Sequence, residues 1–290
     1  MANGGLRYQF SMLNVAEKLV TVCVLLYLID YLLLGVVGFS LSDWFMLPKE
    51  FNAFLRLPWS ILSYSFLHGD IFHLIFNMFM LYYIGRIFFN FHNNKRFAYV
   101  YFLGVLVGGC VFLLTYNTLP NLMAAQTPGL VGASAGIMSV LIFLCAFTPN
   151  QEVRLLFFNV KLWHIGAVLV AVDVLLITAG NNVGGRLAHL GGALLGYFYA
   201  RQLLNGHDIG ESLSNYFSAF GSIFKPSTKE PPLKTVYKKS QAKGKKTAAD
   251  YDKMAHQRKI DAILDKISKS GYESLSKAEK DFLFKAGKED

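Results

Sequence analysis

Apolar residues form long runs over the first two thirds of the chain. A helix needs about 20 mainly apolar residues to cross the roughly 30 Å hydrocarbon core of a membrane. Only helices and closed barrels satisfy all their backbone hydrogen bonds in lipid, so runs of this length predict transmembrane helices. Six segments qualify: 19–39, 71–90, 97–116, 131–148, 163–180 and 186–204. The sequence therefore predicts an all-α membrane protein with a bundle of six transmembrane helices.

Basic residues are concentrated in every second segment that connects these runs. They precede the first run, separate the second from the third and the fourth from the fifth, and follow the sixth: Arg7, Lys18, Arg86, Lys95, Arg96, Arg154, Lys161 and many lysines after Arg201. The opposite connections carry little positive charge, and 117–130 carries none. The positive-inside rule therefore predicts that both termini are cytoplasmic, including an N-terminal segment 1–18.

The connection 40–70 is long and rich in aromatic residues and leucine, with two prolines: Trp44, Phe45, Phe51, Phe54, Leu55, Trp59, Pro48 and Pro58. Aromatic side chains of this kind favour the headgroup region. We expect the loop to lie in the outer membrane interface, although an ordinary extracellular loop has the same composition.

Basic residues are concentrated in the part of the chain that follows the apolar runs. Residues 201–290 hold 18 of the 28 Lys and Arg residues. Segment 205–250 is basic and predicts a flexible linker that faces anionic lipid rather than nucleic acid. In 251–290, apolar residues at helical spacing end before Gly271, and Ser276 with Glu279 forms a capping-box pattern. We expect a small cytoplasmic helical hairpin, with docking and a passive tail as equal alternatives.

The three cysteines, Cys23, Cys110 and Cys145, lie inside apolar runs, and their odd count predicts small buried side chains rather than disulfides. Their spacing does not suit a metal, and we expect neither a metal nor a cofactor. The first apolar run is too long for a cleavable signal peptide, so we expect none.

Candidate chemistry begins with Gly132-Ala-Ser134-Ala-Gly136, a G-x-S-x-G pattern. In soluble hydrolases this pattern joins a strand to a helix, a context that is absent here, and small residues in membrane helices usually form packing faces. His189 changes the interpretation, because an ionisable residue inside a membrane helix is costly and marks a functional site.

Ser134 and His189 each lie about three residues, or roughly 5 Å, inside a span that starts on the outer side, so they are expected at similar depth. Gly192 and Gly196 share the helical face of His189 and predict close packing against the small residues 132–136. A histidine base within hydrogen-bond reach would activate the serine.

A third cluster, His68, His73 and Asn77, begins the second span on the same outer side. Neutral His and Asn donors can stabilise an oxyanion together with the backbone N–H of Ser134. A metal site is the competing interpretation, but no cysteine accompanies these residues and the sequence has no H-E-x-x-H motif.

Taken together, His68-x4-His73-x3-Asn77, Gly132-x-Ser134-x-Gly136 and Ala188-His189-x2-Gly192-x3-Gly196 resemble the signature segments of the rhomboid intramembrane proteases. The resemblance covers about residues 20–204 and implies a protease domain at 19–204. It implies a Ser134–His189 catalytic dyad without a third acid. It also implies an oxyanion or substrate-binding site from His73, Asn77, His68 and Gly132, with the Ser134 amide, and a membrane-embedded 40–70 loop with Trp59 at its usual position.

Two positions depart from the family pattern: Ser60 stands where an arginine often follows the tryptophan, and Met138 where some members have a tyrosine. Two further acids, Asp30 and Asp173, lie inside apolar runs, and we expect helix-pairing hydrogen bonds for them. Asp173 should lie nearer the bilayer centre than Ser134, which argues against a catalytic role.

The predicted function is hydrolysis of peptide bonds in or near transmembrane segments of other membrane proteins. The partners are therefore transmembrane substrates and the lipid bilayer, without nucleic acid or metal. The expected location is a bacterial inner membrane, with the site open to the outer face. Alternatives are a rhomboid-like pseudoprotease that binds membrane clients and a proton-coupled transporter that uses the acids and histidines.

Overall fold

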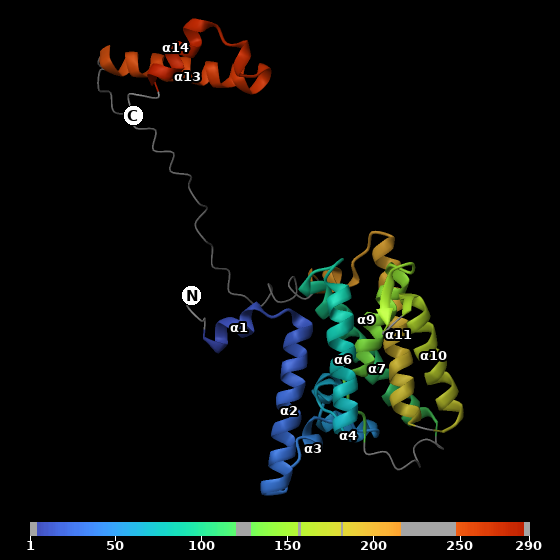
Figure 1. The fold of residues 1–290 in the computed structure, drawn as a ribbon. Helices are drawn as coiled ribbons and strands as arrows, with labels where there is room; N and C mark the ends of the chain where they lie inside the picture. Colours follow the sequence, from blue (N-terminus) through green and yellow to red (C-terminus); the bar gives the residue numbers. More distant parts are fainter. Residues whose placement is uncertain (1–4, 120–128, 156–157, 181, 216–247, 287–290) are drawn as a thin grey trace. The chain divides into compact units, whose positions relative to one another are not determined.

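The computed structural model describes residues 5–119, 129–155, 158–180, 182–215 and 248–286, and the chain divides into two compact units, 1–226 and 227–290 (Figure 1). The six predicted segments of the first unit are helical: α2 (Val15–Val37), α6 (Ile71–Phe88), α7 (Asn94–Thr118), α9 (Ser134–Phe147), α10 (Leu162–Thr178) and α11 (Val183–Leu204). In the described residues, α2, α6 and α7 are long and apolar enough to cross a membrane, whereas α9 and α10 are shorter apolar helices. A further short helix, α1 (Leu6–Met12), precedes α2.

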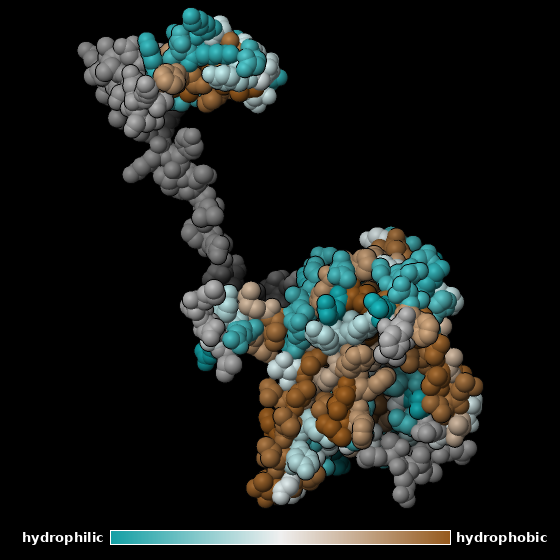
Figure 2. All heavy atoms as spheres, viewed as in Figure 1, coloured by the Kyte–Doolittle hydropathy of each residue, from teal (hydrophilic) through white to brown (hydrophobic). Residues whose placement is uncertain are grey.

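Helices α7, α9 and α11 pack on one another and form the centre of this unit (Figure 1). Helix α10 packs against α9 and α11, α6 packs against α9, and α2 packs against α6. Hydrophobic residues cover the sides of α2 and α6, whereas hydrophilic ones gather at the end of the bundle where α6 ends (Figure 2). An apolar outer surface on helices suits contact with lipid, so this unit is a membrane domain.

Small residues let the central helices approach closely. A Cβ atom on Gly192 would collide with the backbone of Ala135 in α9, and one on Gly196 would collide with the backbone of Ser139. The predicted close approach of α11 to α9 is therefore confirmed. Gly136 was expected on the same contact face but instead faces α7, where a Cβ would lie 2.6 Å from the Tyr101 ring.

The 40–70 loop folds into short helices: α3 (Ser42–Phe45), α4 (Phe51–Arg56), α5 (Ser60–Ser63) and η1 (Tyr64–Phe66). The Trp59 indole N–H donates to the Trp44 carbonyl at 2.9 Å, and the Tyr64 hydroxyl donates to the Val105 carbonyl of α7 at 2.7 Å. The buried Ser60 hydroxyl donates to its own loop at Leu57, 2.6 Å away, so these bonds fix the loop without an arginine at position 60. Large apolar side chains of the loop remain exposed: Trp44, Phe45, Phe51, Leu55 and Trp59.

Two features of this mostly helical unit were not predicted. Two short antiparallel strands, β1 (Glu152–Leu155) and β2 (Phe158–Lys161), lie between α9 and α10 in the sequence. Their register pairs Glu152 with Lys161, and the first strand alternates charged and apolar residues, a period-two pattern that favours a strand. Cys110 is exposed on α7, whereas Cys23 and Cys145 are buried as expected, because an apolar run does not reveal which side of a helix meets its neighbours.

The first residues of the predicted linker 205–250 are held by hydrogen bonds. Asp208 accepts hydrogen bonds from the Arg96 guanidinium at 3.0 Å, from the Tyr199 hydroxyl at 2.5 Å and from the Gly210 amide at 3.1 Å. Residues 205–215 therefore belong to the membrane domain, because this carboxylate holds them against α7 and α11. The rest of the predicted linker, up to 247, lies outside the described residues.

The second unit contains α13 (Ala248–Ser270), η2 (Tyr272–Ser274) and α14 (Lys277–Ala286). Gly271 ends α13 with a φ of 76°, a left-handed conformation that suits glycine. The capping box is present before α14, since the Ser276 amide donates to the Glu279 carboxylate at 2.7 Å and the Glu279 amide donates to the Ser276 hydroxyl at 3.3 Å. Lys266 of α13 pairs with Glu279 at 3.0 Å and connects the two helices.

Candidate active site

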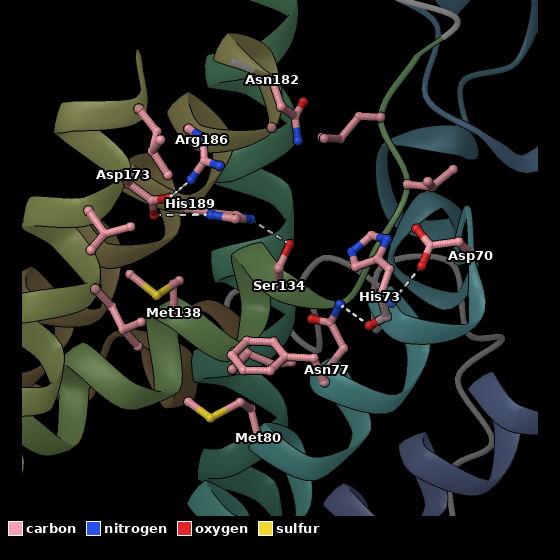
Figure 3. A pocket seen from close by; sticks show the side chains of 18 of the residues that line it. Asp70, His73, Asn77, Met80, Ser134, Met138, Asp173, Asn182, Arg186 and His189 are labelled. Carbon is pink, nitrogen blue, oxygen red and sulfur yellow. Dashed lines mark hydrogen bonds and ion pairs between the residues drawn. The ribbon is translucent and has the colours of Figure 1, made fainter. Parts of the chain in front are cut away.

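Ser134 and His189 are in direct contact, although 55 positions separate them in the sequence. The Ser134 Oγ lies 2.7 Å from the His189 Nε2, and both side chains project from helices that pack on each other (Figure 3). Ser134 is the first residue of α9. The first N–H groups of a helix have no partner within the helix, so the Ser134 amide is placed to bind a ligand oxygen.

Ser134 and His189 do not lie equally far from the starts of their helices, although the sequence predicted that they would. Ser134 begins its helix, whereas His189 lies six residues, or about 9 Å, after the start of α11 at Val183. The equal offset of about three residues was therefore wrong. The start of α11 lies three residues earlier than expected because Gly184 and Gly185 are part of the helix.

Asp173 completes a chain of hydrogen bonds behind His189. Its Oδ2 lies 3.0 Å from the His189 Nδ1, and its Oδ1 accepts from Arg186 Nη1 at 2.9 Å (Figure 3). The carboxylate is only 8% exposed. The expected helix-pairing hydrogen bond is confirmed for Asp173, but its predicted depth was wrong. Asp173 lies five residues, or about 7.5 Å, before the end of α10, which is close to the depth of His189 on α11.

Asp30 behaves differently, although it also lies within an apolar helix. Its Oδ1 accepts from the Leu41 amide at 2.6 Å and from the Ser40 hydroxyl at 3.2 Å. The carboxylate therefore holds the chain that follows α2, and the expected bond to another helix was wrong for this residue.

A cavity of about 580 Å³ opens in front of Ser134. Its walls come from α6, α9, α10, α11 and the segment before α9, and the polar side chains among them are Asp70, His73, Asn77, Ser134, Asp173, Asn182, Arg186 and His189. Most other wall residues are apolar, and Met138 is one of them. Polar groups concentrated at one place in an apolar pocket are typical of a binding or catalytic site.

His73 and Asn77 lie across the cavity from His189, on the other side of Ser134 (Figure 3). Asp70 is the N-cap residue of α6, and its carboxylate accepts a hydrogen bond from the His73 amide at 2.9 Å, so it fixes the first turn of the helix. The Asn77 amide nitrogen donates to the His73 carbonyl at 2.9 Å, and its second N–H remains for a ligand. Both predicted donors therefore face the space beside the serine.

Gly132 contributes space rather than a donor. Its own N–H donates to the Tyr64 carbonyl at 3.0 Å, so this amide is not available to an oxyanion. Its φ is 120°, and a Cβ there would lie 2.8 Å from Cε1 and Nε2 of His73. The predicted role of Gly132 as a substrate-binding group is therefore corrected: glycine lets the chain pass closely over the His73 ring.

His68 is not among the residues that line the cavity. Its ring is buried behind His73, with ring centroids 5.2 Å apart, and neither nitrogen has a hydrogen-bond partner among the described residues. Burial, followed by the nearby His73, lowers the pKa of His68 to about 4. We therefore withdraw His68 from the predicted oxyanion site.

Sequence reasoning missed Asp173 and Arg186 as neighbours of the histidine. Two signals were present: Asp173 is the single acid in its apolar run, and Arg186 precedes His189 by three residues, one helical turn. The predicted bounds of the two helices placed Asp173 and His189 at different depths, so their contact was not expected.

Two family models and several curated proteins match parts of this chain. A family model described as the Rhomboid domain matches residues 56–206, and one described as a family of unknown function (DUF6576) matches residues 249–286. The chain is 34% identical over 147 residues to "RHOMBOID-like protein 12, mitochondrial" of Arabidopsis thaliana, covering 46% of this chain and 43% of that protein. It is 27% identical over 149 residues to "Presenilin-associated rhomboid-like protein, mitochondrial" of Homo sapiens, covering 50% of this chain and 37% of that protein. The chain thus spans less than half the length of these relatives.

Proposed function

The chain belongs to the rhomboid family, and from that premise we propose that it is an intramembrane serine endopeptidase with Ser134 as nucleophile and His189 as general base. The observation that carries the proposal is the 2.7 Å contact between the Ser134 Oγ and the His189 Nε2 inside a cavity walled by apolar helices. A serine hydroxyl is a weak nucleophile until a base within hydrogen-bond reach accepts its proton.

In the proposed reaction, the Ser134 Oγ attacks the carbonyl carbon of the scissile peptide while its proton moves to the His189 Nε2. The tetrahedral intermediate collapses when Nε2 returns this proton to the leaving amine, which breaks the C–N bond and leaves an acyl-enzyme. A water molecule, activated by His189 in the same way, then hydrolyses the ester and restores Ser134.

The negative charge of the tetrahedral intermediate needs donors on the side of Ser134 opposite His189. The backbone N–H of Ser134, the His73 ring and the second N–H of Asn77 provide them in this proposal. Preorganised donors of this kind each contribute about 10²- to 10³-fold in kcat.

We further propose that α2, α6, α7, α9, α10 and α11 all cross the bilayer, with both termini and a small C-terminal helical hairpin on the cytoplasmic side. The distribution of basic residues supports this orientation, and it opens the cavity toward the outer face. The exposed aromatic residues of the 40–70 loop support its position in the outer interface. The expectation of a bacterial inner membrane has no support from the relatives, which are named as mitochondrial.

The proposed substrates are transmembrane segments of other proteins. A helical peptide protects its carbonyl groups with intrahelical hydrogen bonds, so it must unwind before Ser134 can attack. Gly and Pro make a helix easier to unwind, and substrates that contain them near the cut, with a small residue at the cut, are expected to react faster.

The test uses the purified protein in proteoliposomes with a model transmembrane substrate, beside Ser134→Ala and His189→Ala variants. We expect cleavage by the intact protein and loss of about 10⁶-fold in kcat in either variant, as in soluble serine proteases. A fluorophosphonate that labels the intact protein but not Ser134→Ala would identify the nucleophile. Cleavage that survives Ser134→Ala refutes the mechanism, and an intact protein that binds but never cleaves substrates is a pseudoprotease.

A further inference from the structure

Asp173 has an unusual position for a residue of a membrane helix. It is 8% exposed, and both of its oxygens contact side chains of α11: Oδ1 contacts Arg186 and Oδ2 contacts His189. Burial of an ionised carboxylate costs several kcal/mol unless a cation and hydrogen bonds compensate for the lost water. The arrangement therefore needs an explanation beyond the Ser134–His189 pair.

Arg186 provides the compensating charge. A guanidinium stays protonated at every physiological pH, and here its Nη1 lies 2.9 Å from Asp173 Oδ1. The ion pair compensates the charge of the buried carboxylate. It also occupies one oxygen, so the other oxygen is directed at His189.

An ionised carboxylate accepts hydrogen bonds but cannot donate them. The 3.0 Å contact with Asp173 Oδ2 therefore requires the proton of a neutral His189 to lie on Nδ1. The lone pair then lies on Nε2, 2.7 Å from the Ser134 Oγ, where a general base needs it. The other tautomer would present an N–H to the serine and could not accept its proton.

We propose that Asp173, held by Arg186, is a positioning residue that fixes the tautomer and orientation of His189 and stabilises the imidazolium formed during the reaction. This inference rests on the proposed protease function. The serine proton moves to Nε2 and later to the leaving amine, whereas Asp173 keeps its charge and never takes a proton. The arrangement corresponds to the role of the acid in soluble Ser-His-Asp proteases.

The alternative is a purely structural ion pair that holds α10 against α11. Both interpretations predict that loss of Asp173 lowers stability, so stability alone does not separate them. Only a positioning role predicts a fall in kcat at constant KM and a proton on the His189 Nδ1 in the unmutated protein.

The central variant is Asp173→Asn, whose amide keeps the shape and can offer an N–H to Nδ1, which favours the unproductive tautomer. The same change in soluble proteases lowers kcat by about 10⁴-fold. We expect a loss of 10²- to 10⁴-fold in kcat, with KM changed less than threefold. Asp173→Glu, which keeps the charge on a longer side chain, should recover part of the loss.

Asp30→Asn is the matched control. This variant also removes one carboxylate from an apolar helix. Asp30, however, accepts hydrogen bonds from Ser40 and Leu41 and is not among the residues that line the cavity. We expect its kcat to stay within twofold of the unmutated protein. Thermal unfolding of both variants in the same detergent shows how much folded protein each assay contains.

A measurement on the unmutated protein covers the case in which Asp173→Asn does not fold. In protein labelled with ¹⁵N-histidine, the His189 resonances are those missing in His189→Gln, and their shifts report which nitrogen carries the proton. We expect the Nδ1–H tautomer at pH 8.

The outcomes separate the two proposals. If the unmutated protein cleaves and Ser134→Ala does not, the protease function stands whatever Asp173 does. Within that result, an Asp173→Asn variant with kcat within threefold overturns the positioning role, as does an Nε2–H tautomer in the unmutated protein.

Discussion

Gly132→Ala tests whether the chain before Ser134 places the His73 ring. A residue with a Cβ at a φ of 120° is strained, which costs about 1–3 kcal/mol in stability. The new Cβ would lie 2.8 Å from the ring, whereas ordinary contact begins at 3.4 Å, so the ring must move by about 0.6 Å (3.4 minus 2.8). The same Cβ would lie 3.6 Å from the Ser134 Oγ, which leaves the nucleophile undisturbed.

A misplacement of about 1 Å near the reacting groups can cost 10²-fold in rate, and removal of one oxyanion donor costs about 10²- to 10³-fold. We therefore expect Gly132→Ala to lower kcat by about 10- to 100-fold, with KM little changed. The assay is steady-state cleavage of a fluorogenic transmembrane substrate in proteoliposomes. Gly38→Ala is the control, because Gly38 also has a positive φ, 69°, but open space around it, so it should lower stability without lowering kcat.

A double-mutant cycle identifies the cause. In a His73→Ala background the ring is gone, and Gly132→Ala should then cost less than threefold in kcat. The same loss in both backgrounds would falsify the claim that the methyl group acts through His73, and full activity of Gly132→Ala alone would refute the ring's role as well.

Three further predictions concern other parts of the domain. Asn77→Ala should lower kcat by about 10²-fold at constant KM, because one oxyanion donor is lost, and an unchanged kcat would remove Asn77 from the site. His68→Phe should change kcat less than threefold and leave its profile between pH 5 and 8 unchanged, because a pKa of about 4 keeps His68 neutral there. Burial raises the pKa of Asp208, but hydrogen bonds from Tyr199 and Arg96 outweigh this and lower it below 3.8. Its stabilising contribution is therefore present above pH 3.8 and lost as the pH falls through the lowered value. Asp208→Asn should cost about 1–3 kcal/mol at pH 7, and the difference from the unmutated protein in detergent unfolding should disappear in acid.

The helices of the membrane domain could be predicted because their signal is local. A run of apolar residues specifies a helix without reference to its neighbours, and all six runs form helices. The strands β1 and β2 were missed because strands of four residues carry little periodic signal, and they lie in a polar connection where only charge was considered. The exposed side of Cys110 could not be predicted either, because it depends on which helices pack against α7.

For the candidate site, the residue types and the helices that carry them were predictable, but the contacts were not. Ser134, His189, His73 and Asn77 meet around one cavity as expected. Asp173 was rejected on a depth argument that depended on helix ends, and an error of three residues at the start of α11 amounts to about 4.5 Å. That error is larger than a hydrogen bond is long. His68 and Gly132 were grouped with the donors by sequence spacing, whereas burial and backbone geometry separate them.

The contact between Ser134 and His189 also affects how the protein is made. The two residues lie 55 positions apart, and α11 is the last long helix of the domain to leave the ribosome. Until α11 inserts and packs against α9, Ser134 has no base and remains an ordinary hydroxyl at a helix start. Under the proposed mechanism the nascent chain therefore cannot cut its neighbours in the membrane, and the insertion of α11 is itself the activating step.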